Sequence, residues 1–218
     1  MSHDDFDFEP KRGLPDVLPA GETPLWQGAP SWRAVATRIF HVEKVAIYFG
    51  AMMVWRFAAS LSDGNSLLAA TQSGLRLLPL AIAAVVILGL FAWGVGRTTV
   101  YSITNRRVVM RIGMALPLTI NLPFTQIANA DLKINGDRSG DIAFTTATSV
   151  RVPYLALWPH ARPFQLPKPQ PMLRGLAEPQ KVSDILAASL AASMVASRPA
   201  TSESVEARWP QHQLVAAE

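Results

Sequence analysis

Histidine is the residue type in this sequence best suited to metal binding or proton transfer, because the chain of 218 residues contains no cysteine. The four histidines are His3, His41, His160 and His212, and none belongs to an H-x-x-x-H or H-E-x-x-H pattern. The lack of cysteine also excludes disulfide scaffolds, iron–sulfur clusters and thiol nucleophiles. We therefore predict that the protein is not an enzyme and has no catalytic residues, no metal site and no cofactor.

Two groups of residues are candidates for contact sites instead. The first group is Arg106, Arg107 and Arg111. It follows a long apolar run, where arginines could meet anionic headgroups or a protein partner, and solvated turn charges are the alternative. The second group is Trp158, His160 and Arg162. It combines aromatic, polar and basic side chains around a proline and predicts either a recognition turn or a structural turn.

The composition indicates that these residues belong to a membrane protein. Half of the residues are hydrophobic, 17% are charged and the mean hydropathy is +0.20, whereas soluble domains average about 25% charged residues. The length allows one modest domain with appendages. The net charge of +4 is mild, and we predict no nucleic-acid partner. The acidic N-terminal sequence does not resemble a signal peptide.

Two apolar runs predict a transmembrane hairpin over residues 45–96. The second run, 77–95, has no charged residue and is long enough to span a bilayer. The first run, 45–61, contains Arg56, which lies near its end and could reach the headgroups. The alternative is a hairpin buried in a soluble protein. Basic residues before the first run and after the second predict that both termini are cytoplasmic.

Small residues in the two runs predict close packing against other helices, with lipid-facing positions as the alternative. These residues are Gly50, Ala51, Ala83, Ala84 and Gly89. Three further segments lie outside the hairpin and the domain that follows it. Residues 1–30 predict an extended, exposed N-terminal arm, and residues 196–218 a disordered tail. Residues 31–44 carry apolar side chains at helical spacing and predict an amphipathic helix at the membrane surface, or else a helix packed on a soluble core.

Residues 97–195 predict a cytoplasmic antiparallel β-domain. Short runs rich in Val, Ile and Thr alternate with turn residues, which is typical of six or seven strands in a barrel or sandwich. The expected strands are 99–103, 108–112, 119–122, 130–134, 141–145 and 149–154. Prolines in 164–179 predict a loop, and 182–195 predicts a closing amphipathic helix.

The stretch Y-S-I-T-N-R-R-V at residues 101–108, followed by R-I-G at 111–113 and I-N-L-P-F-T-Q-I at 120–127, resembles the bacterial pleckstrin-homology domain family. That family often places its domain directly after a transmembrane hairpin. The resemblance covers about residues 97–195. It implies an α+β membrane protein in which a two-helix hairpin precedes a small seven-stranded antiparallel barrel with a C-terminal helix.

A second resemblance extends over most of the chain. The motifs that carry it are F-D-F-E-P at 6–10, G-L-P at 13–15, L-P-A-G-E at 18–22, L-W-Q-G-A-P-S-W at 25–32, Y-S-I-T-N at 101–105 and W-P-H-A-R-P at 158–163. They are similar to the PuhB-type family of photosynthetic complex assembly proteins. This resemblance implies a membrane-bound factor, acting by protein–protein contacts, that assists biogenesis of the photosynthetic reaction centre and, secondarily, of its light-harvesting 1 antenna.

The resemblance also implies the partners and the location. The expected partners are reaction-centre subunits, light-harvesting 1 subunits, membrane lipid and a second copy of the chain, and the expected location is the bacterial inner, intracytoplasmic membrane. A membrane-tethered lipid-binding or scaffolding protein is one alternative. A bacteriochlorophyll carrier is another, in which His41 would bind the pigment magnesium; an ordinary interfacial histidine is the simpler interpretation of that residue.

Overall fold

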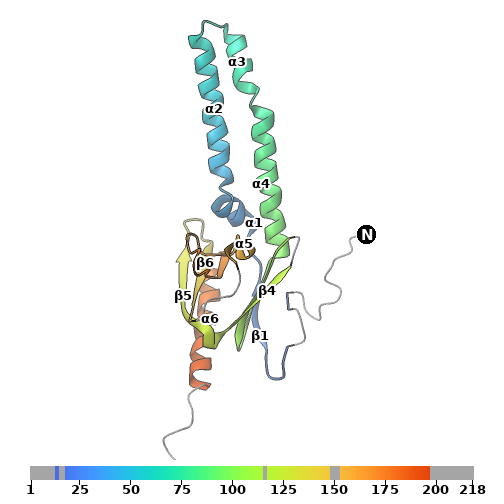
Figure 1. The fold of residues 1–218 in the computed structure, drawn as a ribbon, viewed down its shortest axis with the longest axis vertical. Helices are drawn as coiled ribbons and strands as arrows, with labels where there is room; N and C mark the ends of the chain where they lie inside the picture. The colour runs from blue at the N-terminus through green and yellow to red at the C-terminus, as the bar shows by residue number, and fades with distance from the viewer. Residues whose placement is uncertain (1–12, 15–17, 115–116, 148–152, 197–218) are drawn as a thin grey trace, which may run out of the picture.

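The computed structural model describes residues 13–14, 18–114, 117–147 and 153–196 of the chain. A long helical hairpin extends from one end of a β-rich domain, and the last helix runs toward the opposite end (Figure 1). The expected tail 197–218 and most of the arm before residue 18 lie outside the described residues. The hairpin and the β-rich domain are the two regions that matter for function.

The hairpin consists of α2 (Val42–Ser62), α3 (Leu67–Leu75) and α4 (Leu78–Thr98). Helix α2 and the α3–α4 unit are each long and apolar enough to cross a membrane. No residue of the most apolar stretch of α2 is buried in the described chain. The alternative of a hairpin buried in a soluble core is therefore wrong for this chain on its own, since the β-rich domain does not cover the helices.

Helix α3 occupies most of the segment between the two apolar runs, at the far end of the hairpin. Ser66 caps the helix, with its side-chain oxygen accepting a hydrogen bond from the Ala69 N–H. Ala70 is fully buried against α2. A Cβ added at Gly74 would lie 3.0 Å from the Met53 carbonyl oxygen. The capping serine and the small residues allow the chain to fold back as a helix.

The segment before the hairpin is not the single amphipathic helix that the apolar spacing predicts. It forms the short α1 (Trp32–Ala34), then a π-helical turn, η1 (Val35–Ile39), and His41 adopts a left-handed φ of 51° before α2 begins. Val35 is buried with Ala92 of α4 in a small cluster at the base of the hairpin. The apolar side of this segment is therefore divided, because Val35 and Ala36 are buried against α4 whereas Trp32 is half exposed.

The β-rich domain contains two antiparallel sheets. The first sheet has the strand order β1-β2-β3-β4 and the second has β5-β6-β7. The first comprises β1 (Pro24–Gly28), β2 (Val100–Thr104), β3 (Arg107–Ile112) and β4 (Leu118–Pro123); the second comprises β5 (Ile127–Ile134), β6 (Gly140–Thr146) and β7 (Met172–Leu176). The expected closed barrel is wrong. Strand β4 ends at a proline, which has no N–H to donate, and the 3-10 turn η2 (Phe124–Gln126) redirects the chain into the second sheet.

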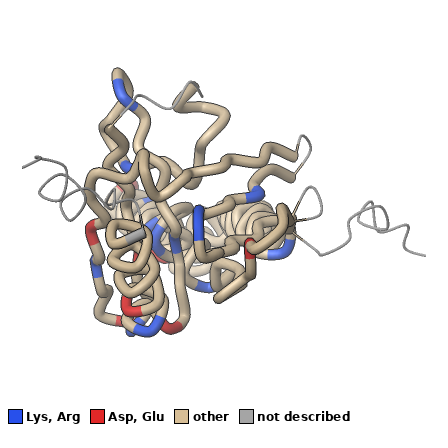
Figure 2. The backbone as a smooth tube through the Cα atoms, turned by 90° about the horizontal axis from the view of Figure 1, so that it is seen from below, with Lys and Arg blue, Asp and Glu red and all other residues tan. Residues whose placement is uncertain are grey.

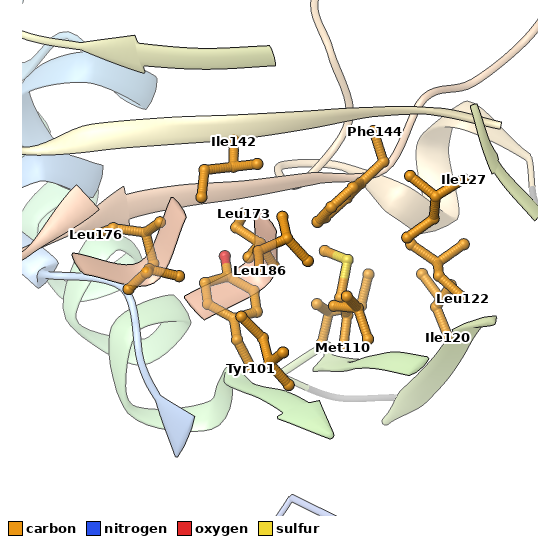
Figure 3. Close-up of a cluster of buried hydrophobic side chains, with 14 of the residues drawn as sticks. Tyr101, Met110, Ile120, Leu122, Ile127, Ile142, Phe144, Leu173, Leu176 and Leu186 are labelled. Atoms are coloured by element: carbon orange, nitrogen blue, oxygen red, sulfur yellow. The ribbon is translucent and has the colours of Figure 1, made fainter. Parts of the chain in front are cut away.

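Apolar side chains of both sheets meet in one core (Figure 3). Tyr101 and Met110 come from the first sheet, and Phe144 and Leu173 from the second; all four are fully buried. Helix α6 (Pro179–Ala196) adds Leu186, so the expected C-terminal helix is confirmed. The core holds the two sheets together without the backbone hydrogen bonds that a barrel would use.

The structure differs from the expected strands and loops at three further places, one of which is the helix α5 (Tyr154–Leu157). Strand β1 pairs with β2, so residues 24–28 of the expected arm belong to the sheet. Strand β7 lies within the expected loop 164–179. The expected strand 149–154 falls mostly outside the described residues, and its last residue begins α5. The two strands that the sequence did not predict each pair with a strand distant in the chain.

Candidate functional site

The three arginines expected to face headgroups or a partner do not form one surface. Arg106 is exposed in the β2–β3 turn, and Arg107 opens β3 beside it. This turn lies at the end of β2 that points away from α4, about 16 Å along the strand. Arg111 lies at the opposite end of β3, where it pairs with Val100 and is buried. Viewed from the sheet end, Lys and Arg are spread over several elements (Figure 2).

Arg107 forms an ion pair within the sheet domain. Its guanidinium donates to both carboxylate oxygens of Glu22, at 2.8 and 2.9 Å, and the Glu22 side chain is buried. The Thr104 hydroxyl donates to the same carboxylate. Burial alone would raise the pKa of Glu22, but the hydrogen bonds from Arg107 and Thr104 outweigh it and lower the pKa. Arg107 therefore fastens the chain before β1 to the β2–β3 hairpin.

His160 does not belong to an exposed recognition turn, because its side chain is buried in a hydrogen-bonded network. Its Nδ1 lies 2.6 Å from the Tyr101 hydroxyl and its Nε2 lies 3.2 Å from the Thr99 hydroxyl. The Tyr101 oxygen also accepts the Arg174 N–H. Burial, together with the nearby Arg174 charge, lowers the pKa of His160 to about 3, and burial raises the pKa of Tyr101. A neutral His160 thus links the start of the first sheet to β7.

The other two members of that turn contact neighbouring elements. The ring of Trp158 is half exposed and packs edge-on against Phe40, with centroids 5.7 Å apart. Phe40 in turn lies 6.5 Å from the Phe91 ring of α4. Arg162 forms an ion pair with Asp131 of β5 at 3.0 Å. Trp158 therefore connects the sheet domain to the hairpin base, while Arg162 holds the turn on the second sheet.

The small residues expected in helix contacts lie on open faces of the hairpin. A Cβ added at Gly50 or Gly89 would meet nothing within 4 Å. The remaining members are exposed or half-buried: Ala51, Ala83 and Ala84. Close approaches within the described chain occur instead at Gly74 of α3, which packs against α2, and at Gly96 of α4, whose added Cβ would lie 3.1 Å from the Trp32 Cβ. Gly50 instead lines an apolar groove of about 350 Å³ between α2 and α4.

A polar pocket lies at the base of the hairpin, where the chain enters α2. Its volume is about 430 Å³, and we name it the basal pocket. Its lining residues are Arg33, Thr37, Arg38, His41, Glu43, Lys44 and Asp137. The sequence alone did not predict a site at these residues. The signal was a set of cations directly before an apolar span, but on a continuous helix Arg38 would lie about 140° around the axis from Arg33. Among the described residues, no group of three or more His, Asp or Glu side chains is placed to hold a metal ion.

Comparison with known proteins agrees with the order of elements. The family model described as "Bacterial PH domain" matches residues 65–190, from α3 to α6. A protein of Rhodobacter capsulatus, described as an uncharacterized 23.7 kDa protein in the puhA 5′ region, is 35% identical over 195 residues. The alignment covers 89% of this chain and 91% of that relative. No solved structure shows a significant match.

The matched region contains helices α3 and α4, strands β2 to β7 and most of α6. The similarity to the R. capsulatus relative covers nearly the whole chain. The sequence motifs before the hairpin and in the sheet domain agree with this match, as does the order of hairpin and sheets. The chain therefore belongs to the bacterial PH domain family, in the PuhB-like group that the R. capsulatus puhA 5′-region protein represents.

Proposed function

We propose that this protein is a membrane-bound assembly factor, without enzymatic activity, for the bacterial photosynthetic reaction centre and, secondarily, for its light-harvesting 1 antenna. The observation that carries the proposal is the similarity to the puhA 5′-region protein over 89% of the chain. The PuhB-type motifs support the same role. The partners would be reaction-centre subunits, light-harvesting 1 subunits and lipid, and the protein could act as a homo-oligomer.

The shape of the molecule supports a role that depends on contacts in the membrane. The hairpin exposes large apolar side chains along its length, such as Ile47, Trp55 and Leu90. The open Gly50 and the apolar groove beside it would let a partner helix approach closely. We infer that the hairpin crosses the bacterial inner, intracytoplasmic membrane and meets nascent subunits there, while the sheet domain stays on one side.

Charge supports a cytoplasmic position for the sheet domain and both termini. Both ends of the hairpin meet the sheet domain (Figure 1). The chain carries five Lys or Arg residues up to Lys44 in the first turn of α2 and thirteen from Arg97 onward, whereas the far end of the hairpin carries only Asp63 and Arg76. Basic flanks face the cytoplasm in most membrane proteins.

Because the chain has no cysteine, single cysteines can test this topology directly. Asp63→Cys at the far end of the hairpin should react with a membrane-impermeant maleimide from the periplasmic side. Lys181→Cys on α6 should react only after the cells are permeabilised. Both positions are exposed, so burial does not limit the reaction. Labelling of Lys181→Cys in intact cells would contradict the orientation.

The assembly role is tested in cells that form photosystems. Deletion of the gene should lower reaction-centre abundance, measured by absorption spectroscopy, while bacteriochlorophyll synthesis continues. The tagged protein, purified in mild detergent, should carry reaction-centre subunits detectable by mass spectrometry. Normal reaction-centre levels in the deletion strain would refute the proposal. Bacteriochlorophyll bands without subunits, lost in His41→Ala, would favour the carrier alternative.

A further inference from the structure

The basal pocket gathers two arginines that would lie on different sides of a regular helix. Arg33 and Arg38 are five residues apart, which on an α-helix separates them by about 140° around the axis. The π-helical turn η1 replaces this spacing, and its hydrogen bond from Phe40 N–H to the Val35 carbonyl spans five residues. Residues five apart then lie on one side, so both arginines line the same pocket.

The left-handed residue His41 completes the pocket. Its φ of 51° turns the chain between η1 and α2, a conformation that residues other than glycine adopt rarely. Its ring Nδ1 lies 3.2 Å from the Thr37 carbonyl oxygen, which holds the turn. Lys44, in the first turn of α2, is thereby brought to the same cavity as the arginines. A residue in this conformation often marks a functional position.

The charges of the basal pocket favour a single anion. Arg38 forms an ion pair with Asp137, from the turn between β5 and β6, at 3.3 Å. Glu43 is the second carboxylate of the lining. Within the described part of the chain, Arg33 and Lys44 have no carboxylate partner, and the guanidinium of Arg33 lies over the ring of Trp32. Three cations against two carboxylates leave one positive charge in excess, which equals the charge of one phosphodiester.

The position of the basal pocket favours a lipid headgroup as the source of such a phosphodiester. Lys44 directly precedes the apolar part of α2, and the next turns of that helix expose Ile47 and Tyr48. A lipid whose phosphate enters the pocket could lay its acyl chains along this apolar face. Basic pockets at the cytoplasmic ends of spanning helices bind lipid headgroups in this way.

We propose that the basal pocket binds the phosphate of a membrane glycerophospholipid, through Arg33, Arg38 and Lys44. This inference rests on the membrane insertion proposed above but not on the role in reaction-centre assembly. It places the lipid contact at the entry to α2 rather than at the exposed Arg106. A bound lipid would brace α1, η1 and the β5–β6 turn against the start of the hairpin.

The test uses the full chain, purified in detergent and stripped of lipid. Phosphatidylglycerol, phosphatidylethanolamine and inorganic phosphate are each titrated, and binding is followed by native mass spectrometry and by the thermal unfolding midpoint. We expect saturable binding of phospholipid and none of inorganic phosphate at the same concentration. The double variant Arg33→Gln/Lys44→Gln should weaken binding about thirtyfold, since two cations near the headgroup are lost.

Two variants make the result specific. Arg106→Gln removes an exposed cation at the far end of β2 and should leave binding unchanged. Arg33→Lys/Lys44→Arg keeps the charges and should retain most of the affinity, which separates loss of charge from loss of folding. Equal weakening by Arg106→Gln, unchanged binding in the Gln double variant, or binding of inorganic phosphate alone would each overturn the proposal. Failure of cysteine labelling at the far end would instead overturn the membrane insertion.

Discussion

The sheet domain and the helical hairpin treat their apolar side chains in opposite ways. In the sheet domain, Tyr101, Phe144 and Leu173 have no solvent exposure. In the hairpin, Trp55 is 70% exposed and Leu90 is 62% exposed. A soluble chain does not leave so large an apolar surface uncovered. The difference indicates that the sheet domain buries its own apolar core, whereas the hairpin presents an apolar surface that the described residues leave uncovered.

The largest effect should come from a matched pair of leucines, one in each region. Leu173→Ala empties a fully buried position between the two sheets and should lower the free energy of unfolding by about 2–5 kcal/mol. Leu90→Ala removes a side chain from the open face of α4 and should change it by less than about 0.5 kcal/mol in detergent. Guanidinium denaturation followed by near-ultraviolet circular dichroism measures both. Equal losses would contradict the contrast between the regions.

The sheet domain should also lose stability in acid through His160, because burial and the nearby Arg174 charge disfavour the protonated form of this histidine. The unfolded chain binds a proton near pH 6.5, whereas the folded pKa is about 3. Stability should therefore fall as the pH drops from 6.5 toward 3, by up to about 1.4 kcal/mol per pH unit. His160→Gln should lose this slope over that pH range. Persistence of the slope in the variant would assign it to another group.

A smaller loss is expected for the ion pair that fastens the chain before β1. Glu22→Gln replaces the carboxylate that accepts both Arg107 hydrogen bonds and should destabilise the sheet domain by about 2 kcal/mol at neutral pH. The expected loss is smaller than for a fully buried pair because Arg107 is partly solvated. The folded pKa of Glu22 is lowered, so its contribution exists above pH 4.5 and is lost as the pH falls through the folded pKa.

Glu178→Gln is the matched control for that ion pair. Glu178 also contacts a cation, Lys181, but both side chains are 65% exposed. Exposed pairs contribute little, so this variant should change the free energy of unfolding by less than about 0.5 kcal/mol. Urea denaturation at pH 7 and pH 4 compares the two variants. If the two variants change the free energy of unfolding by similar amounts, burial of Glu22 does not explain the contribution of its ion pair to stability.

The same contrast explains how much of the fold the sequence could predict. Helix α4 follows from a run without charge, and the turn between β2 and β3 from the Asn105 and Arg106 that separate two β-rich runs. Strand β1 could not be predicted, because its partner β2 lies more than seventy residues away. The hydrogen-bonded network of His160 could not be predicted for the same reason. Its partners Tyr101 and Thr99 lie 59 and 61 positions away in the sequence.

The periodic spacing of apolar residues could not predict the basal pocket, for a different reason. Apolar spacing in 31–44 fits a regular helix, and the π-helical turn and the left-handed His41 that break it follow no glycine or proline signal. This irregular backbone is stabilised by tertiary contacts, because it lets Val35 pack on α4 and Arg38 form an ion pair with Asp137 between β5 and β6. Local patterns predict regular elements well, and they fail where distant contacts select an irregular backbone.

The smallest stability effects should separate the inner and outer faces of the hairpin. Gly74→Ala would place a methyl group 3.0 Å from the Met53 carbonyl oxygen, so α3 must shift away from α2 and the hairpin should lose about 1 kcal/mol. Gly50→Ala enters open space and should be neutral or stabilising by up to about 1 kcal/mol, since alanine favours the helix.

Gly50 and Gly89, the two glycines on the open faces of the hairpin, test whether these faces bind a partner helix. If Gly50 is where a partner helix approaches, Gly50→Leu should leave the thermal midpoint of the purified protein unchanged and yet reduce the reaction-centre subunits that copurify with it. Gly89→Leu, on the open face of α4, reports whether the contact extends across the groove. If copurification survives both substitutions, the open face meets only lipid, and the partner contact must lie on the sheet domain, where the half-exposed Trp158 joins it to the hairpin.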